Sequence, residues 1–234
     1  MYEYLIINIL VIFFPFVLSF DRKVAFFRNW KHLVPTYLTV GVAFVVWDVF
    51  ATDAGHWSFN ESFITGIKLF GLPVEEIMFF ITVPYACIFT YEVIRAYMRD
   101  WEVPFNRWTY AILGLFLLVP ALVFHDQGYT FIVLISLSFV LVAVPFLVPE
   151  VFQRRSYWIF ILITMGLFLL VNHFLTSIPV VEYGAEEIWG GDGAWNGRFI
   201  HIPLEDFIYN ISLLTGYLSV YLLSKRVLGS DRDG

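Results

Sequence analysis

Long apolar segments constrain the fold of this chain more than any other feature of its sequence. A helix needs roughly 17–25 mostly apolar residues to cross a bilayer. Seven segments meet this requirement, at residues 4–20, 34–52, 73–97, 108–124, 129–148, 157–175 and 203–223. Each is apolar on all sides and far longer than a β-strand, so helices are favoured over a barrel. We therefore predict an all-α membrane protein with seven transmembrane helices.

The composition excludes other classes of protein. Hydrophobic residues make up 59% of the 234 residues and charged residues only 15%, whereas a soluble domain carries about 25% charged residues. A net charge of −6 argues against a nucleic-acid partner. Cys87 is the single cysteine, which excludes an internal disulfide framework and a cysteine-rich metal cluster. The expected surroundings are membrane lipid, and we expect a multi-pass protein of the plasma membrane.

The basic residues predict the orientation of the helices. Twelve of the 14 Lys and Arg residues fall on one side of the predicted bundle, and only Lys68 and Arg198 fall on the other. Basic loops stay in the cytoplasm, so we expect the N-terminus outside and the C-terminus inside. The twelve are Arg22, Lys23, Arg28, Lys31, Arg95, Arg99, Arg107, Arg154, Arg155, Lys225, Arg226 and Arg232.

Two similar motifs indicate an internal repeat. The third segment opens with Pro-Val-Glu-Glu at 73–76, and the seventh opens with Pro-Leu-Glu-Asp at 203–206. Both segments run inward, so the repeats have the same orientation. We predict a first repeat at 1–107, a connecting helix and short loop at 108–128, and a second repeat at 129–234.

Four acids in these motifs are the candidate catalytic residues: Glu75, Glu76, Glu205 and Asp206. Acids in a first helical turn also stabilise the helix dipole, so a structural role is the alternative. Helix capping, however, does not require two adjacent acids twice, and ionisable groups near the hydrocarbon boundary are costly. Adjacent residues lie about 100° apart around a helix, so one acid of each pair can face the bundle interior.

Six further residues are candidates for substrate binding. Phe79, Phe80, Tyr209 and Asn210 follow the four acids by one helical turn. Asp48 and His173 lie near the outer ends of the second and sixth segments, level with the acid pairs, although each alone is typical of a hydrogen-bonding core residue. The histidines have no metal-ligand spacing, so no metal site is predicted. The last segment has no interior lysine, which argues against a retinal Schiff base.

At the two acidic motifs the chain resembles the small membrane lycopene cyclases of bacteria, archaea and fungi, in particular the fused single-chain form of the heterodimeric type. Further similarity covers nearly the whole chain, at residues 7–10, 19–24, 73–76, 84–87, 91–92 and 202–207. The resemblance implies conversion of lycopene to carotenoids with β-ionone rings (γ-carotene and β-carotene), by an isomerase, with the acids of both motifs as catalytic residues.

The residues are compatible with this chemistry. Cyclisation protonates a terminal double bond, closes a ring on the resulting cation and removes a neighbouring proton. Clustered carboxyl groups at low dielectric can hold the proton, and aromatic rings can stabilise the cation. A lipophilic substrate would reach the site from the bilayer. No dinucleotide fingerprint is present, so we expect no cofactor, neither flavin nor nicotinamide.

Two alternatives remain open from the sequence. A carotenoid hydratase or a cyclase of C50 carotenoids would also begin by protonating an end group. A proton-coupled seven-helix transporter or ligand-binding protein would use the same acids at the repeat interface without chemical change. The sequence does not predict an oligomeric state.

Overall fold

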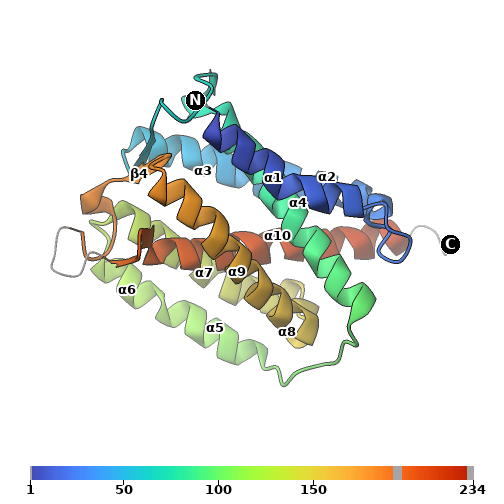
Figure 1. Cartoon of the computed structure of the whole chain (residues 1–234). Helices are drawn as coiled ribbons and strands as arrows, with labels where there is room; N and C mark the ends of the chain where they lie inside the picture. Colours follow the sequence, from blue (N-terminus) through green and yellow to red (C-terminus); the bar gives the residue numbers. More distant parts are fainter. Residues whose placement is uncertain (1, 192–196, 231–234) are drawn as a thin grey trace.

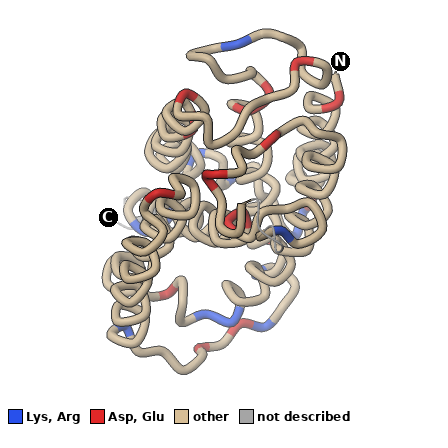
Figure 2. Tube along the Cα trace, turned by 90° about the vertical axis from the view of Figure 1, so that its left-hand side faces the viewer, with Lys and Arg blue, Asp and Glu red and all other residues tan. Residues whose placement is uncertain are grey.

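The computed structural model describes residues 2–191 and 197–230. Arg232, one of the basic residues that predict the orientation, lies outside the described residues. The described residues form a bundle of elongated helices, with short β-strands gathered at one end and the last turns of the final helix at the opposite end (Figure 1). We call the end that carries the β-strands the β end. Charged residues are a small part of the trace (Figure 2).

Helices form at each predicted apolar segment. The second segment is part of one helical run at Phe26–Asp53, and two consecutive helices within Arg107–Val123 form the fourth. The helices are α1 (Glu3–Leu18), η1 (Phe26–Asn29), α2 (Trp30–Thr36), η2 (Tyr37–Gly41), α3 (Val42–Asp53), α4 (Val74–Tyr97), α5 (Arg107–Phe116), α6 (Leu118–Val123), α7 (Gly128–Leu147), α8 (Glu150–Gln153), α9 (Arg155–Ser177), η3 (Ala185–Glu187) and α10 (Leu204–Ser230).

Length and composition identify the helices that can cross a membrane. Within the described residues, five helical runs are long and apolar enough: Phe26–Asp53, Val74–Tyr97, Gly128–Leu147, Arg155–Ser177 and Leu204–Leu228. The helices Glu3–Leu18 and Arg107–Val123 are also apolar but shorter. The chain is therefore a mostly helical, multi-pass membrane protein.

The helices α4 and α10 form the centre of the bundle. α1 and α9 pack against α4, whereas α7 and the α2–η2 region pack against α10. The side chains of Ile88 on α4 and of Leu214 and Tyr217 on α10 are fully buried. Gly41 permits the close approach of η2 to α10, because a Cβ atom there would lie 2.9 Å from the Tyr217 hydroxyl oxygen.

Short antiparallel strands at the β end lead into the two central helices. β2 (Lys68–Leu69) pairs with β3 (Leu72–Pro73) before α4, and β5 (Arg198–Phe199) pairs with β6 (Ile202–Pro203) before α10. Each hairpin has a non-glycine residue with positive φ in its turn, Phe70 at 55° and Ile200 at 61°. β1 (Trp57–Phe59) pairs with β4 (Val181–Tyr183), so the loops after α3 and α9 are joined.

Candidate active site

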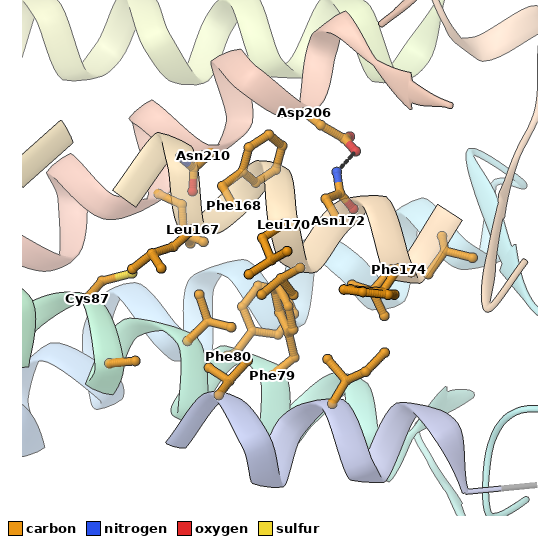
Figure 3. Close-up of a pocket in the computed structure, with 18 of the residues that line it drawn as sticks. Phe79, Phe80, Cys87, Leu167, Phe168, Leu170, Asn172, Phe174, Asp206 and Asn210 are labelled. Carbon is orange, nitrogen blue, oxygen red and sulfur yellow. Dashed lines mark hydrogen bonds between the residues drawn. The ribbon is translucent and has the colours of Figure 1, made fainter. Parts of the chain in front are cut away.

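One cavity of about 500 Å³ lies beside α4 and α10. Its wall is formed mainly by side chains of α1, α4, α9 and α10, with contributions from α3, α7, β1 and β4 (Figure 3). Most lining residues are aliphatic or aromatic. The acidic lining residues are Asp48, Glu76 and Asp206, which lie on α3, α4 and α10.

The second acid of each predicted pair lines the cavity. Glu76 and Asp206 are 9% and 3% exposed, and both belong to the first turn of a central helix. Their position follows from the rotation of about 100° between adjacent residues of a helix. Figure 3 shows Asp206 directed toward Asn172 of α9.

The first acid of each pair lies outside the cavity wall and binds the backbone of the preceding loop. Glu75 Oε1 accepts a hydrogen bond of 2.7 Å from the Thr65 backbone N–H. Glu205 Oε1 accepts one of 2.6 Å from the Trp189 backbone N–H and one of 2.5 Å from the Thr130 hydroxyl. These hydrogen bonds connect Glu75 and Glu205 to the loops at the β end.

Three donors converge on the carboxyl group of Asp206. The Tyr129 hydroxyl donates to Oδ1 at 2.5 Å, while Asn172 Nδ2 and the Tyr183 hydroxyl donate to Oδ2 at 2.6 Å and 2.8 Å. Burial raises the pKa of Tyr183, and the neighbouring Asp206 raises this pKa further. Tyr183 therefore remains a hydrogen-bond donor at neutral and moderately alkaline pH.

Glu76 and Asp48 have fewer partners. The Tyr4 hydroxyl donates to Glu76 Oε2. Asp48 Oδ1 accepts a bond of 2.9 Å from the Trp57 indole N–H and a weak one of 3.4 Å from Thr52, while its buried Oδ2 has no hydrogen-bond partner among the described residues. The cavity therefore joins three carboxyl groups in different hydrogen-bonding environments.

Five of the six predicted substrate-binding residues line the cavity, and one lies outside it. Phe79, Phe80, Tyr209 and Asn210 line the cavity, as does Asp48. His173 lies outside the cavity wall, and its ring centroid is 6.0 Å from that of His201. The side chain of Asn210 is buried, and its Nδ2 has no hydrogen-bond partner among the described residues.

Several lining residues were not predicted from the sequence. Tyr4, Tyr129, Tyr183 and Asn172 contact the acids, and Trp57 contacts Asp48. The predicted repeat contained a signal for two of these residues. Tyr4 and Tyr129 occupy equivalent positions, because each is the second residue of the first helix of its repeat. Trp57 begins β1 and Tyr183 ends β4, and the two residues face each other in the register of this pair. No local sequence pattern indicated this pairing.

The fold and site define a helical membrane protein that holds carboxyl groups at the wall of an apolar cavity. The model of the lycopene cyclase family matches residues 2–94 and 126–223. The chain therefore belongs to the lycopene cyclase family, and a carotenoid is its substrate class. No curated protein and no solved structure matches the chain.

Proposed function

We propose that this protein is a lycopene β-cyclase, which isomerises the linear ends of lycopene to β-ionone rings without a redox step. The observation that carries the proposal is the pair of buried carboxyl groups, Glu76 and Asp206, at the wall of one apolar cavity. Proton transfer to and from a hydrocarbon requires one acid and one base, and it requires few other polar side chains. The family match supports the substrate class.

We assign the role of general acid to Glu76. Tyr4 donates to Oε2, and Oε1 accepts no hydrogen bond within the described part of the chain. Glu76 lines the cavity, and it can carry its proton on Oε1. We assign the ionised form to Asp206. Its carboxyl group accepts three hydrogen bonds and donates none to the described residues, which stabilises a carboxylate. Asp206 is then the base.

The proposed reaction conserves atoms and charge. The Glu76 O–H protonates the terminal carbon–carbon double bond, which leaves a carbocation on the substrate and a carboxylate on Glu76. A second double bond attacks the cation and closes the six-membered ring. Asp206 removes a proton from the ring carbon next to the polyene, which places the ring double bond in conjugation and gives the β-ring. Return of this proton to Glu76 completes the cycle.

Aromatic side chains support the cationic intermediate. The ring centroids of Trp57 and Tyr129 are 5.1 Å apart, and those of Tyr129 and Tyr183 are 5.8 Å apart. Phe79 and Phe80 line the same cavity. Aromatic faces attract cations most strongly where water is excluded, so this wall suits a carbocation and not a hydrated ion.

We also propose that all seven apolar segments cross the bilayer, as two parallel three-helix repeats joined by a connecting helix, with the N-terminus outside and the C-terminus in the cytoplasm. Three features support the repeat: the matching hairpins before α4 and α10, the equivalent Tyr4–Glu76 and Tyr129–Asp206 hydrogen bonds, and the pairing of β1 with β4. The distribution of Lys and Arg supports the orientation.

Production of the protein in cells that accumulate lycopene tests the function. We expect pigments with β-rings and an unchanged molecular mass, as measured by chromatography and mass spectrometry. Addition of water would identify a hydratase. Unchanged lycopene, with the full-length protein present in the membrane, would contradict the proposal.

A further inference from the structure

The cavity is elongated along the helices. On α4 its lining residues run from Glu76 to Thr90, on α1 from Tyr4 to Pro15, and on α9 from Thr164 to Leu175. At a rise of 1.5 Å per residue, the α4 wall alone is about 21 Å long. The cavity is therefore a groove parallel to the helix axes, which we call the α1–α4–α9 groove.

Polarity is concentrated at one end of this groove. Asp48, Glu76 and Asp206 lie at the β end, whereas Cys87, Thr90 and Thr164 lie toward the other. The hydroxyl groups of the two threonines are already bonded within their own helices, Thr90 to the Ala86 carbonyl at 2.8 Å and Thr164 to the Phe160 carbonyl at 2.8 Å. Among the described residues, the distant end of the groove therefore offers apolar surface and no nitrogen or oxygen atom that requires a polar ligand.

One side of the groove is lined by large apolar side chains that are exposed. Large apolar side chains of α1 and α9 line the groove and are also exposed on the outside of the bundle. Phe14 on α1 is 65% exposed and Leu170 on α9 is 57% exposed. Both helices pack against α4, so α4 forms the floor of the groove and the gap between α1 and α9 forms its opening. The residues of this kind are Leu10, Phe14, Leu167, Leu170 and Phe174.

We propose that the α1–α4–α9 groove binds the polyene chain of a linear carotenoid, which enters sideways between α1 and α9 and lies parallel to the helices with one end at the carboxyl groups. This inference rests on the proposed function. An extended carotenoid is roughly as long as the ~30 Å hydrocarbon core, so the groove holds most of one molecule in a single direction. Only one end reaches the acids, and the second ring requires release and rebinding in reverse.

The shape and polarity of the groove favour this occupant over a membrane phospholipid. A phospholipid whose acyl chain filled the apolar part would place its phosphate near the carboxyl groups, among which Asp206 is ionised in the proposed mechanism. Like charges at low dielectric repel strongly. A hydrocarbon with no headgroup meets no such penalty and presents a double bond to the acids.

Retention of lycopene by the purified protein tests the groove separately from catalysis. Glu76→Gln serves as the background, because loss of the acid keeps bound pigment linear. To this background we would add Leu170→Trp, which narrows the opening, or Thr90→Phe, which fills the distant end. Leu162→Trp is the matched control, since Leu162 is 74% exposed on α9 and does not line the groove. Bound lycopene per protein is measured by absorbance, and thermal unfolding checks the fold of every variant.

We expect Leu170→Trp and Thr90→Phe each to reduce retained lycopene about tenfold, equivalent to about 1.4 kcal/mol, and Leu162→Trp to leave it unchanged. Retention equal to the background in both groove variants would overturn the inference even if the wild type forms rings. Co-purification of phospholipid in place of lycopene would overturn it as well. Loss of retention in the groove variants, with no ring formation by the wild type, would support the groove and refute the proposed function.

Discussion

The hydroxyl group of Tyr129 donates a hydrogen bond of 2.5 Å to Asp206, and this bond joins α7 to α10 at the β end of the bundle. Tyr4 and Glu76 form the equivalent bond between α1 and α4. Each half of the chain thus supplies one acid that is held by a tyrosine near the start of its first helix, and both acids line the same cavity. Asp206 has two further donors, Asn172 and Tyr183. The hydrogen bonds differ in number at the two acids, which gives a physical basis for different protonation states.

The adjacent acids on α4 should respond differently to the same change. Glu76→Gln removes the proton donor, and we expect cyclisation to fall by about 10²–10⁴-fold. Glu75→Gln keeps the oxygen that accepts from the Thr65 N–H, so activity should stay near that of the wild type. Product formation per membrane-inserted protein is the measurement. Equal losses in the two variants would show that the cavity geometry does not separate their roles.

On α10 we expect one acid to support the reaction and the other to support the fold. Asp206→Asn should abolish product formation, because an amide cannot accept the proton, while thermal unfolding changes little. Glu205→Ala removes the acceptor for Trp189 and Thr130, and we expect it to destabilise the protein by about 1–3 kcal/mol. Unfolding is followed in detergent. A stable but inactive Glu205→Ala protein would refute this division.

Asp48 should assist cyclisation through its negative charge or through the carboxyl oxygen Oδ2, which accepts no hydrogen bond from the described residues. Its Oδ2 has no partner among the described residues although it is buried, so Asp48→Asn should lower the rate about tenfold or more without loss of insertion. Thr52→Ala is the control, because it deletes only the weak 3.4 Å contact with Oδ1. Wild-type rates in Asp48→Asn would assign this residue to packing alone.

Ionisation of Tyr183 should not lower the activity at any pH below about 10. Burial raises the pKa of Tyr183 above its ordinary value of about 10, so its hydroxyl still donates to Asp206 there. The same shift lowers stability only above about pH 10, where the unfolded tyrosine ionises first and the folded one resists. Tyr183→Phe should therefore reduce the rate equally at pH 7 and pH 9. A reduction confined to pH 7 would contradict the expected protonation state.

The seven helical segments were predictable from the sequence because hydrophobicity over about 20 residues is a local property. The observed α4 and α9 end within two residues of the predicted segments. The acidic motifs were also visible, since few charged residues interrupt these segments and each is therefore conspicuous. The rotation of about 100° between adjacent helical residues predicted that one acid of each pair can face the bundle interior, but the structure buries both acids of each pair.

The tertiary structure buries all four acids and decides which acid of each pair lines the cavity. Glu75 and Glu205 bind loop amides, whereas Glu76 and Asp206 line the cavity. The two adjacent acids of each motif look alike in the sequence, so the sequence did not distinguish them. The partners Tyr4, Tyr129, Asn172 and Tyr183 come from distant segments, and Tyr183 is brought to Asp206 with the strand that pairs with β1. Hydropathy specifies which segments become helices, but the contacts between them depend on the packing of side chains that are far apart in sequence.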